Sequence, residues 1–211
     1  MAITRIGGAN AISGTIPVSV GGTGVTTSAN LANTGNLVLL SSQDASNDAS
    51  INFDNTLITT TYDTYKVVYK NVRPSTDNIG FYLKPSVDNG SNFLEMHRNM
   101  QGNISSHASN TTLTRHNTSG SGSQNLNIGY NLGNANEENA SSEITFYNLQ
   151  SDNRNKHFTF LGCFEDQNTS NTVMAQGGFA IHTTSKVNYL RFEFGSGNIA
   201  SGQFILYGVK T

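Results

Sequence analysis

The sequence predicts an all-β fold, a sandwich, jelly roll or barrel, preceded by an extended N-terminal arm. Its 28 Asn, 23 Ser, 23 Thr and 21 Gly together make up 95 of the 211 residues, and only 12% of the chain is charged. These small polar residues favour turns and caps over helix interiors, and long surface helices usually carry many Lys, Glu and Arg. Short segments of period-2 alternation recur from residue 37 onward, which is typical of half-buried strands. No repeat of fixed period is present, so a propeller or solenoid is disfavoured.

Residues 1–36 differ from the rest of the chain. They contain no aromatic residue and one charge, Arg5, and their apolar residues alternate briefly before Gly21-Gly22-Thr23-Gly24. One interpretation is a flexible tail. The other is an arm that becomes ordered only against a partner or sister chains, for which we expect five apolar contact residues: Ile12, Ile16, Val18, Val20 and Val25.

Residues 37–211 are expected to form the β domain. Alternating apolar residues predict strands within 65–69, 79–83, 126–132, 144–147, 158–164, 190–194 and 203–209. Clusters of Gly, Pro, Asn, Asp and Ser separate these segments, as turns do. This many short strands without a credible helix indicates two packed layers or a closed barrel.

Residues 99–125 interrupt this spacing. They contain no aromatic residue and are dominated by Asn, Ser, Thr and Gly. We expect a long polar excursion from the sandwich here, because such loops in compact domains usually carry function or lack fixed structure.

One short motif, Ser86-Val87-Asp88-Asn89-Gly90-Ser91-Asn92-Phe93, has the S-x-D-x-G-x-x-aromatic form of the Asp box of sialidase-like β-hairpins. Asp88 is expected to accept hydrogen bonds from turn amides, Gly90 to take positive φ, and Phe93 to return to the core. A single copy indicates a hairpin and not sialidase chemistry. A calcium ion at Asp88 would find too few carboxylates for a strong oxygen cage.

No catalytic or metal-ligating residue is predicted, and no cofactor. The single cysteine excludes an intramolecular disulfide, and its apolar neighbours predict that Cys163 is a buried small hydrophobe. The five histidines show no zinc spacing. Carboxylate pairs occur at Glu137-Glu138 and Glu165-Asp166, and a glycan-active enzyme stays an alternative only if two carboxyls share a cleft.

Net charge and hydropathy disfavour nucleic acid and the membrane interior as partners. A net charge of −2 gives no electrostatic footprint for nucleic acid. The longest aliphatic run, 37–40, is far shorter than the roughly 20 residues of a membrane span. The N-terminal residues lack the apolar region of a secretory signal, so we expect synthesis in a cytoplasm.

Several segments resemble small virion structural and tail-fibre proteins of tailed bacteriophages. Residues 17–24 resemble the GGTG joint near the start of phage fibre segments, and residues 37–53, 62–78, 86–93 and 196–210 resemble parts of a β domain common in such proteins. The resemblance implies an antiparallel, jelly-roll-like β-sandwich, a virion location and a homotrimer, and it carries over no catalytic residue.

The expected function is therefore a non-enzymatic phage structural protein. Residues 1–36 would anchor a fibre or appendage subunit to other virion proteins, and residues 37–211 would present a β-sandwich to the host surface, with glycan as a candidate ligand. No receptor-contact residue is assigned. The alternative is a capsid decoration protein, a cement or head-fibre subunit, whose arm clamps neighbouring shell subunits.

Overall fold

A computed structural model describes residues 36–95, 98–107, 110–116, 126–167 and 172–210. Leu39–Thr211 forms one compact unit of the chain. The arm residues Ile12, Ile16, Val18, Val20 and Val25 lie outside the described residues, so their contacts stay a prediction.

The described residues form twelve β-strands and no helix, as the composition predicts. The strands are β1 (Leu37–Ala45), β2 (Ile51–Phe53), β3 (Thr64–Pro74), β4 (Ile79–Ser86), β5 (Arg98–His107), β6 (Asn110–His116), β7 (Leu126–Leu132), β8 (Ala140–Tyr147), β9 (Lys156–Glu165), β10 (Thr172–Ile181), β11 (Tyr189–Phe194) and β12 (Ile199–Val209).

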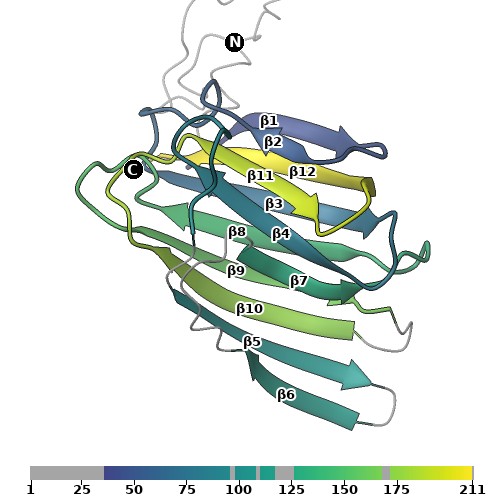
Figure 1. Ribbon diagram of the computed structural model, residues 1–211. Helices are drawn as coiled ribbons and strands as arrows, with labels where there is room; N and C mark the ends of the chain where they lie inside the picture. Colours follow the sequence, from purple (N-terminus) through teal and green to yellow (C-terminus); the bar gives the residue numbers. More distant parts are fainter. Residues whose placement is uncertain (1–35, 96–97, 108–109, 117–125, 168–171, 211) are drawn as a thin grey trace, which may run out of the picture. The chain divides into compact units, whose positions relative to one another are not determined.

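Two antiparallel sheets pack together as a β-sandwich (Figure 1). The larger has the order β1-β12-β3-β8-β9-β10-β5-β6, and the smaller has the order β2-β11-β4-β7. Eight of these strands, β1-β12-β3-β8 facing β2-β11-β4-β7, have the order of a jelly roll, in which consecutive strands alternate between two sheets.

Two inserted hairpins widen only the larger sheet. The β5–β6 hairpin lies in the connection from β4 to β7, and the β9–β10 hairpin lies in the connection from β8 to β11. They join where β10 pairs with β5, with Met174 opposite Ile104. The polar excursion predicted at 99–125 therefore contains two paired strands, which continue the large sheet past the smaller one (Figure 1).

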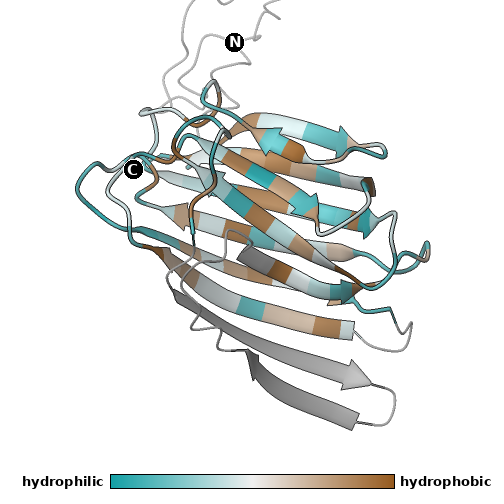
Figure 2. Ribbon diagram, viewed as in Figure 1, coloured by the Kyte–Doolittle hydropathy of each residue, from teal (hydrophilic) through white to brown (hydrophobic). Residues whose placement is uncertain are grey.

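Alternation along strands such as β3 builds the core. On β3, Tyr65, Val67 and Tyr69 are buried while the intervening residues are less so, and Figure 2 shows the same alternation of hydropathy along the strands. Aromatic rings from both sheets then meet, with centroids 5.4 Å apart for Tyr69 and Phe81. Such edge and tilted contacts add to the free energy gained by burying the rings.

The prediction for Cys163 is wrong, because its side chain is exposed. On β9 the buried aromatic positions are Phe158, Phe160 and Phe164, and Cys163 shares the opposite, outward face with Leu161. Apolar neighbours in sequence placed Cys163 in the right strand, but successive side chains of a strand point to opposite faces.

Candidate functional site

The hairpin from Ser86 to Phe93 is held by one carboxylate. Asp88 Oδ1 accepts hydrogen bonds from Ser86 Oγ at 2.6 Å and from the Asn92 amide at 2.8 Å, and Oδ2 accepts one from Asn92 Nδ2 at 2.7 Å. The Ser86 hydroxyl, followed by the Asn92 side chain and amide, lowers the pKa of Asp88 to about 2. Because both carboxylate oxygens already have partners within the turn, Asp88 acts as a structural hydrogen-bond acceptor.

The other two hairpin residues shape the turn around Tyr189. Gly90 has φ of +86°, and a Cβ there would lie 2.8 Å from the Tyr189 ring. Contrary to the prediction that Phe93 returns to the core, Phe93 is half-buried and is not one of the core residues; its ring centroid lies 6.5 Å from that of Tyr189. The positive φ of Gly90 and the closeness of the Tyr189 ring both favour glycine at this position.

A cationic and aromatic cluster lies beside this hairpin on the smaller sheet. The Arg191 guanidinium lies over the Phe93 ring at 4.7 Å, donates from Nε to Asn52 Oδ1 at 3.1 Å, and lies 3.9 Å from a Glu193 carboxylate oxygen. Glu193 also pairs with Lys84. We call the set the Arg191 cluster: Asn52, Lys84, Phe93, Tyr189, Arg191 and Glu193. Its charges and its Phe93 ring face are occupied by one another, which leaves little for a ligand to bind.

Glu138 is buried, so it is not one of two carboxyl groups that line an open cleft. Glu138 is 3% exposed, and its Oε2 accepts a hydrogen bond from the Ala135 amide at 2.8 Å, so it closes the local turn, while Glu137 is exposed. Glu165 ends β9, and Asp166 forms a β-bridge with Leu132. Among the described residues, no group of three His, Cys, Asp or Glu side chains is placed to hold a metal ion. In the same residues, no helix is long and apolar enough to cross a membrane.

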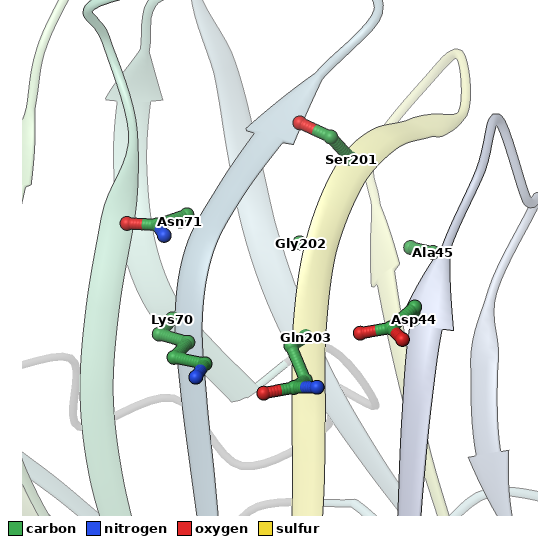
Figure 3. Close-up of a pocket in the computed structure, with 7 residues that line it drawn as sticks. All are labelled: Asp44, Ala45, Lys70, Asn71, Ser201, Gly202 and Gln203. Carbon is green, nitrogen blue, oxygen red and sulfur yellow. The ribbon is translucent and has the colours of Figure 1, made fainter.

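A polar hollow of about 380 Å³ opens on the larger sheet where β1, β12 and β3 lie side by side (Figure 3). This hollow, called the polar hollow below, is lined by seven residues: Asp44, Ala45, Lys70, Asn71, Ser201, Gly202 and Gln203. The residues come from three strands that are distant in sequence, so only the sheet order brings them together.

Irregular pairing on both sides of β3 surrounds the polar hollow. The register of β12 against β3 shifts twice between Ile199 and Gln203, and that of β3 against β8 shifts between Tyr69 and Val72. Bulges of this kind bend a strand and redirect its side chains. The backbone is also irregular at these positions, since Asn71 has φ of +54° and Gly202 has φ of +136°.

Gly202 is required by space as well as by conformation. A Cβ on this residue would lie 2.7 Å from the Cα of Val72, which is backbone that cannot swing aside. The close approach of β12 to β3 at this point therefore needs glycine.

The polar groups of the hollow form a row across the three strands. Gln203 is opposite Lys70 in the register, and Figure 3 shows Gln203 lying between Lys70 and Asp44, its carbonyl end toward the lysine and its nitrogen toward the carboxylate. Within the described residues, none of these three side chains makes an ion pair or a hydrogen bond to another side chain. A cation, an amide and a carboxylate are thus all available at one place.

An apolar patch lies on the outward face of the inserted β9–β10 hairpin. Leu161 is 50% exposed and Met174 is 40% exposed, and Cys163 is directly opposite Met174 in the register. Soluble proteins commonly expose small apolar patches, so this patch does not by itself indicate a binding site.

The sequence reasoning located the hairpin residues Asp88, Gly90 and Phe93 but missed the polar hollow. The available signal was Gly202, a glycine inside a strand pattern, which often marks a bulge or a close backbone approach. The alternation along β1 and β3 does not indicate that Asp44 and Lys70 lie near Gly202.

No protein-family model, curated protein or solved structure matches this chain.

Proposed function

We propose that this chain is a non-enzymatic structural subunit of a phage virion. Residues 1–36 anchor a fibre or appendage subunit to other virion proteins, and the jelly-roll-like sandwich faces the host surface and attaches to it. The subunit works as a homotrimer, and its ligand is a host-surface glycan.

The widened sheet is the observation that most supports this proposal. Two hairpins from separate connections extend one sheet of the jelly roll from four strands to eight, while the opposite sheet keeps four. Widening one sheet alone enlarges the outward face of that sheet, while the inward side of the β9–β10 hairpin also adds residues to the core. A broad face of this kind suits contact with a large, flat partner such as a cell surface.

The surface chemistry supports attachment through many weak contacts. The chain is only 12% charged and rich in Asn, Ser and Thr, whose amides and hydroxyls both donate and accept hydrogen bonds. Three linked copies would raise apparent affinity through effective concentration, without any new contact. A densely paired β domain also suits a particle whose survival outside cells depends on slow unfolding.

The experiment locates the protein and tests its attachment. Immunogold electron microscopy of purified particles, with an antibody against residues 37–211, is expected to place gold on the tail. Purified full-length protein is expected to label host cells and to compete with infection.

Two controls define the alternatives. A variant lacking residues 2–35 is expected to stay folded but to be absent from particles, and its full incorporation would contradict the anchoring role. Gold over the head together with no host labelling would replace attachment by capsid decoration, and absence of the protein from particles would refute a virion role altogether.

A further inference from the structure

We propose that the polar hollow binds one pyranose unit of a glycan through the row formed by Lys70, Gln203 and Asp44. This inference rests on the proposed attachment function and assigns to it a ligand class and a site. Three properties of the hollow carry it: its size, its pattern of donors and acceptors, and its fixed backbone.

The size of the hollow suits a small ligand. Its volume of about 380 Å³ lies at the lower end of the roughly 300–1,000 Å³ range of small-molecule sites. The hollow opens on the outer face of the larger sheet, so a sugar within a polymer can enter it without threading the rest of the chain through the protein (Figure 3).

The row alternates donors and acceptors in the way that a sugar ring requires. The Lys70 ammonium donates, the Gln203 carbonyl accepts, the Gln203 nitrogen donates and the Asp44 carboxylate accepts (Figure 3). Each sugar hydroxyl donates one hydrogen bond and accepts others, so neighbouring hydroxyls can bridge successive members of the row. A purely anionic or cationic ligand would meet one favourable and one unfavourable charge here.

The backbone around the row is fixed in advance. The register shifts of β12 and β3 and the close approach of the Gly202 backbone to Val72 define the paths of the two strands that carry Gln203 and Lys70. Binding then orders only the side chains and the sugar, which limits the entropic cost.

The other two surface features fit a ligand less well. The Arg191 cluster already satisfies its own charges, and the patch at Leu161, Cys163 and Met174 offers no row of hydrogen-bonding groups. The hollow itself is lined by no aromatic ring, so a single site is expected to bind in the millimolar range, with affinity for cells coming from several copies.

The test uses full-length protein and ligand-observed saturation-transfer NMR. The probes are the methyl glycosides of glucose, galactose, mannose, rhamnose and N-acetylglucosamine. The variants are Asp44→Asn and Lys70→Met, which keep side-chain size while removing charge, and their combination. Lys66→Met is the matched control, because Lys66 lies on the same strand as Lys70 and is paired with Glu143 at 2.6 Å, outside the lining of the hollow.

Wild-type protein is expected to bind at least one glycoside, each single variant to bind it at least about fivefold more weakly, and Lys66→Met to bind it within twofold of wild type. Binding of no glycoside by wild type, or equal binding by wild type and the double variant, would overturn the inference.

Host-cell labelling separates this failure from failure of the proposed function. If wild type and the double variant label cells equally, attachment stands and the hollow is not its site. If wild type labels no cells while glycoside binding depends on Asp44 and Lys70, the hollow binds sugar and the attachment proposal fails.

Discussion

Asp88 shows how the carboxylate of one residue fixes a local structure. Its carboxylate accepts three hydrogen bonds from Ser86 and Asn92, and the Ser86 hydroxyl accepts in turn from the Gly90 amide at 3.0 Å. Hydrogen bonds to the ionised carboxylate favour the charged form over the neutral form. The hairpin is therefore coupled to pH through this one group.

The substitution Asp88→Asn is expected to remove that coupling. The pKa of Asp88 falls from 3.8 to about 2 in the folded chain, so its stabilising contribution is complete above about pH 4 and is lost as the pH falls through 2. Urea unfolding should show a smaller free energy of unfolding for the variant at neutral pH, and a gap to wild type that narrows between about pH 4 and pH 2.

One control accompanies this prediction. Carboxyl-detected NMR should report a pKa of about 2 for Asp88 in wild type and a higher value in Ser86→Ala, because the hydroxyl is the largest cause of the shift. A gap between wild type and Asp88→Asn that is the same at all pH values would contradict the assignment.

At the scale of elements, the inserted β9–β10 hairpin has one buried face and one exposed face. Phe160 and Phe179 stack on its inward face with ring centroids 5.4 Å apart, and both are at most 4% exposed. Leu161, the neighbour of Phe160, is half exposed on the outward face. The inserted strands thus extend the core as well as the sheet surface.

Phe160→Ala is expected to lower the free energy of unfolding by about 3–5 kcal/mol, because it removes a stacked ring and leaves a cavity. Leu161→Ala, the matched change on the other face, should alter it by only about 0.5 kcal/mol. Chemical denaturation of both variants checks this. Hydrogen exchange can contradict this prediction. If Phe160→Ala speeds amide exchange only within residues 156–181 and leaves the free energy of global unfolding unchanged, the hairpin is a separate folding unit and not part of the core.

At the scale of the whole molecule, one hydrophobic core accounts for the described fold. Its buried residues run in sequence from Ala45 to Leu206 and come from both sheets, from the jelly-roll strands and from the β9–β10 insertion alike. A domain with its own core is expected to fold without the segments that precede it.

Deletion of residues 2–35 should therefore leave a cooperative unfolding transition whose free energy lies within about 1 kcal/mol of the full-length value. Circular dichroism and urea denaturation at several protein concentrations make the comparison. A concentration dependence that is present only in the full-length chain would show that the arm stabilises an oligomer, whereas loss of the transition would show that the domain depends on residues 2–35.

The sequence by itself determined the all-β class, the buried face of several strands and the hairpin chemistry at Asp88. These features are local: alternation assigns side chains such as Tyr65, Val67 and Tyr69 to one face, and a turn needs only neighbouring residues. The strand Thr172–Ile181 escaped prediction because its glycines and small residues weaken the alternating signal.

Only the tertiary structure decided which strands are neighbours. Alternation gives each strand a face but no partner, so it could reveal neither the junction of β10 with β5 nor the row of Asp44, Gln203 and Lys70 across β1, β12 and β3. Strand pairing is a non-local choice, set by packing of the whole core and by the bulges that adjust the register. The polar hollow is a product of that choice.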